Sequence, residues 1–455
     1  MKSKINCLLF GLLTSGIIVA CSSGTSNSSS TQSLVVGGYG YAYNTPESAY
    51  YNMAPVWWDG KNNIHQFPTA VQNFESYYFC GGSLSGLAAS GKNVLAAGSI
   101  STCIGPEDDP IVWIHAGYWV NAESFIALNQ NNFPLATANS ILNYNGSTIV
   151  GGAMATDLSL EPKPTIWNNN IINILPIPES ADGGAMVNSL ITDNNNNLYA
   201  GGLIKIAQGV IRAIYWKVNL NNIQNSQYHI FTLDDPSGEE LIASGPVVVS
   251  VSTTGNVSVS ANYANSKVFK RGVVWQQTGN GFTPIGFGSQ PANGFQEEYS
   301  SNSSLKNING QTMIIGGISN QNNYGYESPA YGIGINVYSL NTVSSLINIG
   351  TGTDVTNIGN SIFISGYTFD RIESGSNILY SVASYWNNGN RVDLPGLQSS
   401  NCSQGAQCSN ITYKMIPFAN FYDIAANVES NNIYRVESHT QVQSAAATNI
   451  ISVQN

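Results

Sequence analysis

Charged residues are scarce in this sequence. Only 9% of its 455 residues are Asp, Glu, Lys or Arg, whereas 10% are aromatic and 45 are glycine. This composition favours short strands joined by turns over charged amphipathic helices, so we expect very little helix. Positive charge is the scarcer kind: 16 Lys and Arg residues stand against 26 Asp and Glu, for a net charge of −10. Such a chain should repel nucleic acid and anionic lipid surfaces, and we predict no nucleic-acid partner.

Motifs that carry catalysis or metal binding are missing as well. The sequence contains no Gly-x-Ser-x-Gly, His-Glu-x-x-His or phosphate-binding loop. It has no Cys-x-x-Cys pair, no Asp-x-Asp-x-Asp spacing, and four scattered histidines, which is a poor pattern for a metal site. We therefore predict no metal, no cofactor and no catalytic residue.

Long hydrophobic runs are absent except near the N-terminus, where an apolar stretch from Cys7 to Ala20 follows Lys2 and Lys4. The stretch is too short for a stable membrane span and indicates a signal peptide over residues 1–20. Its end, Ile18-Val-Ala-Cys21, resembles the bacterial lipobox, whose cysteine is diacylated and becomes the mature N-terminus. This resemblance implies a lipoprotein anchored through Cys21. The serines that follow, in place of aspartate, imply the outer membrane of a Gram-negative bacterium. The alternative is an ordinary secretory leader in which Cys21 is incidental.

The next segment, residues 21–32, is a Ser/Gly tether that we predict to be disordered, because it is too polar to fold. In an exported chain the remaining cysteines are expected to form disulfides. Their spacing predicts two local bridges, because the other pairings would join distant loops. The predicted pairs are Cys80 with Cys103 and Cys402 with Cys408.

A repeat of 49 to 60 residues runs through the rest of the chain. Its first sign is a short apolar strand that ends near glycine, at residues 34–38, 94–98, 148–152, 198–202, 257–261, 313–317 and 362–366. A second strand, usually with tryptophan, follows each of these, at 56–58, 111–113, 165–167, 214–216, 273–275, in degenerate form at 333–337, and at 384–386. Asn-Gly and Gly-Asn pairs between strands supply the positive φ angles of two-residue hairpins. A period of this length with four strands per repeat predicts an all-β, seven-bladed β-propeller with four-stranded antiparallel blades.

The phrase Tyr385-Trp-Asn-Asn-Gly-Asn390 resembles the "YW-x-NG" repeats of exported bacterial propeller proteins, and the glycine-doublet strands resemble those of kelch propellers. Tyrosine and tryptophan are adjacent here, whereas kelch repeats separate them, which weakens any transfer of kelch partner binding. We place the propeller at residues 33–443 and a C-terminal tail at 444–455. The C-terminus is expected to close the ring by supplying the inner strand of the first blade from Tyr422–Val428. Whether 433–437 or 34–38 fills the next place in that blade stays open.

Long connections between strands are expected to share one face of the propeller, at 39–54, 69–82, 99–110, 129–138, 153–163, 176–186, 203–212, 234–245, 262–271, 288–301, 318–330, 367–382 and 396–421. They hold 18 of the 26 acidic residues and many tyrosines. Long loops on a rigid scaffold are a common place for binding, although loops are also polar for no functional reason. The candidate ligand-binding residues on this face are Tyr41, Tyr78, Asp108, Asp109, Arg212, Arg271, Tyr324, Tyr326 and Arg371.

These features predict an envelope lipoprotein, periplasmic or surface-exposed, that acts as a non-catalytic binding module for a glycan or a protein. One alternative is a glycan hydrolase or lyase that uses paired acids such as Glu239-Glu240 or Glu297-Glu298, because glycoside hydrolysis needs two carboxyl groups. Another is a scaffold for outer-membrane assembly.

Overall fold

A computed structural model gives the fold. The chain divides into two units, Met1–Thr31 and Gln32–Asn455. The structure describes parts of the second unit: residues 32–42, 52–59, 63–69, 78–90, 93–104, 111–156, 161–181, 183–206, 210–234, 238, 240–264, 271–279, 281–286, 299–319, 328–333, 336–342, 350–371, 379–394, 411–412, 437–438 and 445–454. The predicted signal peptide and Cys21 lie outside these residues. Within them, no helix is long and apolar enough to cross a membrane.

Four of the sheets follow one plan, with four antiparallel strands paired in chain order. We call each such set of four strands a blade. These sheets are β12 (Ala185–Thr192), β13 (Leu198–Lys205), β14 (Ile211–Val218) and β15 (Gln227–Phe231); β16 (Ile242–Val251), β17 (Val257–Ala264), β18 (Arg271–Thr278) and β19 (Gly281–Gly286); β20 (Tyr299–Ile308), β21 (Gln311–Ser319), β22 (Ser328–Ile333) and β23 (Asn336–Ser339); and β24 (Gly350–Ile358), β25 (Ser361–Arg371), β26 (Leu379–Asn387) and β27 (Asn390–Asp393). A 3-10 turn, η2 (Ile223–Asn225), precedes β15.

A larger sheet consists of two such blades joined by one parallel pairing, Ile114 with Leu135. Its strands are β4 (Tyr78–Ser90), β5 (Asn93–Ile104), β6 (Ile111–Val120), β7 (Ile126–Ala127), β8 (Leu135–Tyr144), β9 (Ser147–Ala155), β10 (Lys163–Asn168) and β11 (Ile171–Ile174). A further sheet has the order β3–β2–β1–β30, and a small pair stands apart. These strands are β1 (Gln32–Ala42), β2 (Asn52–Trp58), β3 (Ile64–Gln66), β30 (Ala445–Gln454), and the pair β28 (Ile411–Thr412) and β29 (Glu437–Ser438).

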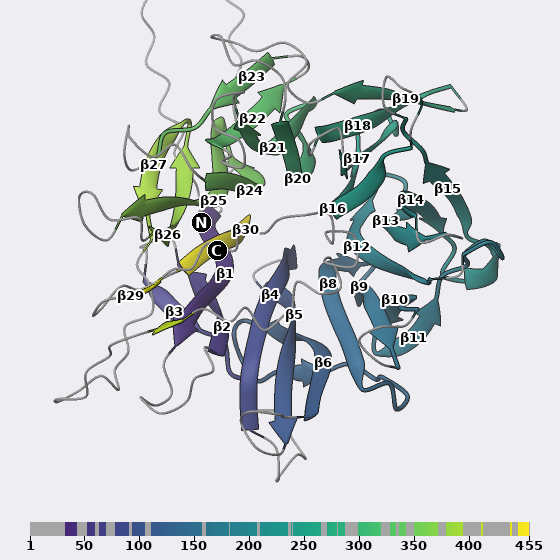
Figure 1. The fold of residues 1–455 in the computed structure, drawn as a ribbon, viewed down its shortest axis with the longest axis horizontal. Coiled ribbons are helices and arrows are strands. Elements are labelled where there is room, and N and C mark those ends of the chain that lie inside the picture. Colours follow the sequence, from purple (N-terminus) through teal and green to yellow (C-terminus); the bar gives the residue numbers. More distant parts are fainter. Residues whose placement is uncertain are drawn as a thin grey trace, which may run out of the picture. The chain divides into compact units, whose positions relative to one another are not determined.

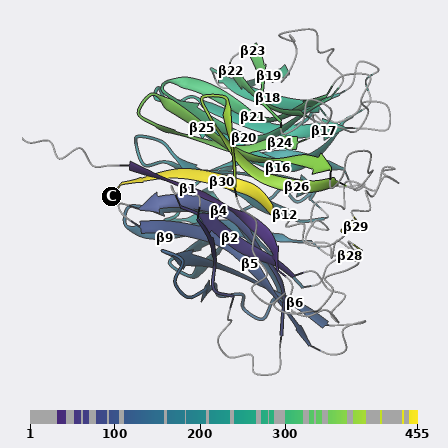
Figure 2. The ribbon, with the colours of Figure 1, turned by 90° about the vertical axis from the view of Figure 1, so that its left-hand side faces the viewer.

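The first strands of successive blades contact one another: β4 with β8, β8 with β12, β12 with β16, β16 with β20, β20 with β24, β24 with β30, and β30 with β4. Figure 1 shows these strands innermost, with the other strands of each blade farther from the centre. Figure 2 shows the strands of several blades side by side, running between two opposite edges. Antiparallel four-stranded sheets arranged in this way form a β-propeller. The predicted all-β class and the four-stranded antiparallel sheets are confirmed.

The C-terminal strand β30 pairs with β1, from Gln32 opposite Gln454 to Gly40 opposite Ala445. A C-terminal strand was expected in this place, but not this one. β30 falls within residues 444–455, which the sequence analysis assigned to a tail, while 422–428 lie outside the described residues. The run Ile450-Ile-Ser-Val453 is rich in β-branched residues, which suit a strand that is paired along its whole length.

Tryptophans of four third strands join their blades to the preceding ones. The indole N–H of Trp216 donates to the carbonyl of Pro176 at 2.8 Å, and Trp119, Trp167 and Trp386 make the same bond to Pro68, Asn129 and Asn341. In all four cases the acceptor lies two residues beyond the outermost strand of the preceding blade. All four side chains are fully buried. Each tryptophan therefore fills the space between two blades and satisfies a carbonyl there.

Two of the predicted signature strands need correction. In β6 the equivalent tryptophan is Trp119, opposite Ala96, and not Trp113, which lies opposite Thr102. Both tryptophans occur in one ten-residue strand, so only the register with β5 distinguishes them. The degenerate repeat predicted at 333–337 is two strands, because β22 ends at Ile333 and β23 begins at Asn336. Its tryptophan position is occupied by Gly332, opposite Ile314.

The glycine doublets are explained by close approach. A Cβ atom on Gly152 would lie 1.8 Å from the carbonyl oxygen of Thr137 in the innermost strand of the same blade. A Cβ atom on Gly151 would lie 2.7 Å from the Val187 side chain of the next blade. The second glycine thus allows β8 and β9 to pack closely, and the first allows two blades to pack against each other.

Polar side chains bind the innermost strand of the following blade. The Ser189 hydroxyl of β12 donates to the carbonyl of Val247 in β16 at 2.9 Å and accepts the N–H of Val249 at 3.1 Å. Asn262 of β17 makes a similar pair of bonds to the backbone of Asn302 in β20, with Nδ2 donating at 3.0 Å and Oδ1 accepting at 2.6 Å. The inner edge of each of these strands would otherwise present open backbone groups.

Candidate functional site

Strand order places the connections at two edges. First-to-second and third-to-fourth connections are short turns, such as Asn145-Gly146 and Asn169-Asn170, and we call their side the short-turn edge. The remaining connections, between second and third strands and between blades, lie at the opposite side, which we call the long-connection edge. The predicted binding residues can now be placed against this edge.

Most of these residues have only their backbone described. Tyr41 lies near the end of β1, Tyr78 begins β4, Arg271 begins β18, and Arg371 ends β25, so all four backbone positions are at the long-connection edge. Their side chains, and residues Asp108, Asp109, Tyr324 and Tyr326, lie outside the described part of the chain. Whether these residues form one site stays a prediction.

Arg212 is the candidate whose side chain is described, and it forms an ion pair. Near the start of β14, its Nε donates to Oε1 of Glu240 at 2.5 Å, and the two side chains are 24% and 30% exposed. Glu240 is held by a backbone bridge to Asp234, in the connection between β15 and β16. The pair therefore sits at the long-connection edge where two blades meet, with polar atoms open to a ligand. Sequence reasoning missed this pairing, because the two residues are 28 positions apart and no pattern links them.

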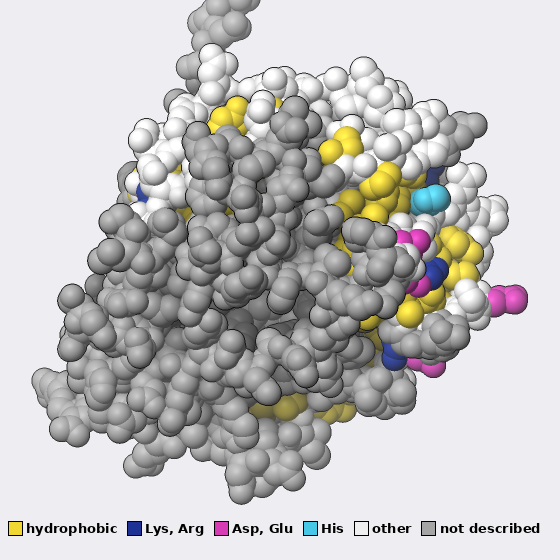
Figure 3. Space-filling model, turned by 45° about the horizontal axis from the view of Figure 1, so that its top comes forward, with side chains coloured by type: hydrophobic (Ala, Val, Ile, Leu, Met, Phe, Trp, Pro, Cys, Tyr) yellow, Lys and Arg dark blue, Asp and Glu magenta, His cyan; other side chains and the backbone are white. Residues whose placement is uncertain are grey.

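A buried tyrosine lies close to this ion pair. The Tyr263 hydroxyl in β17 donates to the carbonyl of Phe231 in β15 at 3.3 Å, across the boundary of the two blades. Burial raises the pKa of Tyr263 well above its ordinary value, and the Glu240 charge adds to this while Arg212 opposes it. Tyr263 is thus a neutral hydrogen-bond donor over the usual pH range. Figure 3 shows one face of the molecule, where acidic, basic and histidine side chains gather beside hydrophobic ones.

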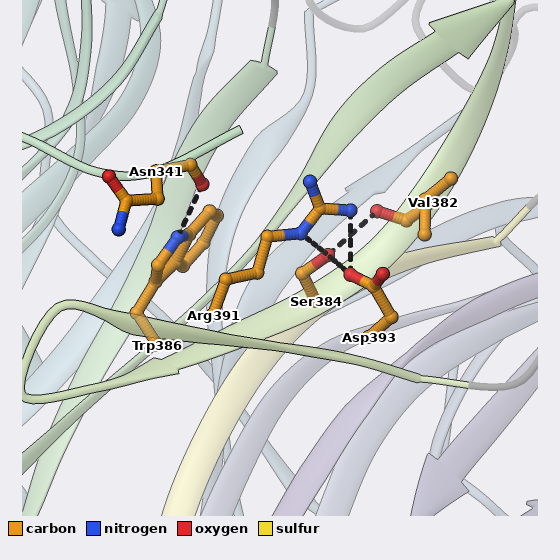
Figure 4. Close-up of polar contacts among 6 residues, drawn as sticks. All are labelled: Asn341, Val382, Ser384, Trp386, Arg391 and Asp393. Carbon is orange, nitrogen blue, oxygen red and sulfur yellow. Dashed lines mark hydrogen bonds and ion pairs between the residues drawn. The ribbon is translucent and has the colours of Figure 1, made fainter. Parts of the chain in front are cut away.

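A second arginine, Arg391, lies almost buried in the blade formed by β24 to β27. Its side chain is 8% exposed in β27, and its Nη2 lies 2.6 Å from Oδ1 of Asp393. Its Nε donates to the Ser384 hydroxyl at 3.2 Å, beside the Trp386 bond to the Asn341 carbonyl (Figure 4). Among the described residues, Nη1 has no hydrogen-bond partner. Sequence reasoning did not select Arg391, because it directly follows the repeat phrase Tyr385–Asn390, which predicts only strands and a turn.

The described residues bear on metal binding and on one of the two predicted disulfides. In the described ranges, no three His, Cys, Asp or Glu side chains are grouped so that they could hold a metal ion. Cys80 and Cys103 lie in the paired strands β4 and β5, where Cys103 is opposite Tyr78. This proximity is compatible with the predicted bridge, while Cys402 and Cys408 lie outside the described residues.

Comparisons with known proteins give no family. No protein-family model matches the chain, and no curated protein matches it. Among solved structures, an endo-arabinanase of glycoside hydrolase family 43 from Bacillus licheniformis is 12% identical over 55% of this chain and 95% of its own, with a TM-score of 0.29. The β-propeller domain of the Trilobed protease from Pyrococcus furiosus is 8% identical over 73% and 99%, with a TM-score of 0.36. Drosophila Semaphorin 1a, domains 1–2, is 9% identical over 83% and 88%, with a TM-score of 0.37. At these values the likenesses carry no argument about activity.

Proposed function

We propose that this protein is a lipid-anchored, kelch-like, seven-bladed propeller that binds a ligand at its long-connection edge without converting it. The division of connections between the two edges carries this proposal, because one edge holds nearly all of the long connections and the other holds tight turns. A glycan is the ligand that this edge suits best. Its connections are rich in tyrosine and acid, and aromatic faces stack on sugar rings while carboxylates accept hydroxyl hydrogens. β30 would complete the first blade.

The Arg212–Glu240 pair supplies the side chains for a test. A glycan array probed with the purified protein should give specific binding, and Arg212→Gln should weaken it roughly ten- to hundredfold, since a lost charge-assisted hydrogen bond costs roughly 1.5–3 kcal/mol. Lys217→Gln is the matched control, because Lys217 is exposed in the same strand near the short-turn edge. Equal loss in both variants, or no binding to any glycan, would contradict the proposal.

The same assay distinguishes the two alternative functions, a glycan hydrolase or lyase and an assembly scaffold. Product formation from a bound glycan would establish the hydrolase or lyase alternative. Capture of an outer-membrane assembly protein by crosslinking, without glycan binding, would establish the scaffold.

The lipid anchor has a test of its own. Metabolic labelling with a fatty acid in a Gram-negative host should label the wild-type protein and leave Cys21→Ser unlabelled. A labelled Cys21→Ser variant, or an unlabelled wild type, would remove the anchor from the proposal. Non-reducing peptide mapping would show whether Cys80–Cys103 and Cys402–Cys408 are the bridges.

A further inference from the structure

The two edges of the propeller differ strongly in charge. The connections that meet at the long-connection edge hold 20 acidic residues and four basic ones, for a net charge of −16; the basic residues are Lys267, Lys270, Lys414 and Arg435. The turns of the short-turn edge hold three acids and two lysines, for a net charge of −1; these are Asp59, Lys61, Lys92, Glu123 and Asp193. The sequence of the connections that meet at one edge is therefore strongly acidic, and that of the turns at the other edge is nearly neutral.

The short turns are built from asparagine and glycine, which explains their neutrality. Asn121, Asn169 and Asn388 have φ angles of 52°, 47° and 48°, a conformation that asparagine tolerates better than most residues. Their side-chain oxygens accept backbone N–H groups at the start of the second strand, at 2.9, 3.0 and 2.9 Å. Hairpin geometry therefore selects an uncharged amide at this edge, whatever its surroundings.

The folded unit also begins at the short-turn edge. β1 runs from Gln32 to Ala42, and its far end leads into the long connection to β2, so Gln32 lies at the short-turn side, opposite Gln454. Figures 1 and 2 show β1 and β30 side by side. Any attachment through residue 21 therefore reaches the folded unit at its neutral edge.

The length of the predicted tether limits which edge of the propeller can approach the membrane. The predicted tether places 11 residues, 21 to 31, before Gln32, and a random coil of that length spans about 18 Å on average. The 11-residue strand β1 covers about 36 Å from one edge to the other. The long-connection edge could approach the anchoring surface only if the tether were close to full extension. Acidic side chains on that edge would then also face the negative lipid headgroups within the screening length of about 8 Å at physiological salt.

We propose that the short-turn edge is the surface that faces the membrane, and that the propeller stands with its acidic long-connection edge directed away from the lipid. This inference rests on the proposed lipid anchor at Cys21. It identifies the partner of the short-turn edge as a phospholipid headgroup surface. The ligand-binding edge is thereby presented to the space beyond the membrane.

The test uses the full lipidated chain in vesicles of phosphatidylethanolamine and phosphatidylglycerol that contain a headgroup nitroxide quencher. A fluorophore is attached through an azide-bearing residue at Asn195, exposed in a short turn, or at Ser180, exposed at the long-connection edge. We expect quenching at position 195 to be at least about threefold stronger than at 180. Equal or reversed quenching of vesicle-bound protein would overturn the orientation.

Different outcomes of this experiment would contradict the proposed anchor and the proposed orientation. Cys21→Ser should leave the vesicles and lose quenching at both positions. If wild type does not bind vesicles, or if Cys21→Ser binds equally well, the proposed anchor is wrong, whatever the quenching ratio. Raising the salt concentration should reduce the 195-to-180 ratio in anionic vesicles and leave it unchanged in purely phosphatidylcholine vesicles. No salt effect in the anionic vesicles would remove charge as a cause of the orientation.

Discussion

Tryptophans such as Trp216 have two roles: the ring packs between two blades, and the indole N–H donates to a backbone carbonyl. The sequence alone does not distinguish these roles. Their recurrence predicted a buried strand in each blade, and the burial of Trp216 agrees with this. The hydrogen bond from its indole to Pro176 was not predictable, because the acceptor is a backbone carbonyl 40 residues away. The periodicity of side chains indicates which positions face a neighbouring strand or blade. Backbone carbonyls are present at every residue, so the sequence does not indicate which of them accepts a hydrogen bond.

Trp216→Phe should destabilise the protein by about 2 kcal/mol, because the buried Pro176 carbonyl loses its donor and part of the ring volume is lost. The matched control is Trp57→Phe. Among the residues that the structure describes, the buried Trp57 indole N–H has no hydrogen-bond partner, so its removal should cost little or slightly stabilise the protein. Urea unfolding of both variants is the measurement. A similar loss in the two variants would mean that packing alone accounts for the tryptophans.

Gly152→Ala should cost about 3 kcal/mol or more, since the new methyl group would overlap the Thr137 carbonyl. Gly146→Ala is the control. Gly146 has a φ of 81° but nothing within 4 Å, so its substitution should cost only about 1 kcal/mol of backbone strain. Thermal unfolding of the two variants would show the difference, and equal melting temperatures would contradict close approach as the reason for the doublet.

His115 should make stability depend on pH. It is buried in β6, 2.9 Å from the Thr102 hydroxyl, and burial lowers its pKa below the ordinary value. Between its folded and unfolded pKa values, the unfolded chain binds more protons, so stability falls as pH drops below about 6.5, by at most about 1.4 kcal/mol per pH unit. His115→Gln should remove this component from a series of unfolding curves between pH 7.5 and 5. An unchanged pH dependence would show that His115 is not its source.

Strands and turns were predicted well where one residue type is forced by backbone geometry. The pair Asn388-Gly389 marked the turn after the third strand, and Asn388 there accepts the N–H of Ile362 near the start of the second strand. The inner strand of the first blade was misplaced, because β30 carries no glycine doublet or tryptophan that would identify it. A strand without repeat residues can be found only from its pairing partner.

Removal of residues 445–454 should strongly destabilise the folded unit, because β1 loses its partner along nine residue pairs, from Gln32 to Gly40. A synthetic peptide of these ten residues, added in excess, should restore part of the lost melting temperature by binding the open edge. A scrambled peptide is the control. Normal stability of the truncated protein, or equal rescue by the scrambled peptide, would show that β30 does not hold the first sheet together.

The class of fold of the whole molecule was more predictable from the sequence than the details of single strands or residues. A period near 50 residues, with glycine and tryptophan at fixed places, determined the class of fold before any register was known. The functional edge was less predictable. Topology brings Tyr41, Arg271 and Arg371 to one side, but the Arg212–Glu240 contact depends on a connection whose course no local rule fixes.

Because each described inner strand contacts those of two neighbouring blades, we expect one cooperative unfolding transition. Calorimetry should give a ratio of calorimetric to van't Hoff enthalpy near one, and Trp216→Phe should shift the whole transition. A separate low-temperature transition in that variant would instead indicate blades that unfold independently, as in open repeat arrays.

The tryptophan bond has a consequence for protein engineering. Its acceptor lies two residues past the outermost strand, at Pro176 and Asn341 among others, so the bond is complete before most of each inter-blade connection begins. Foreign sequences grafted beyond these acceptors would leave the contacts between blades in place. The propeller is thus suited to carry libraries of exchanged loops, displayed in parallel on a frame that does not need to be redesigned.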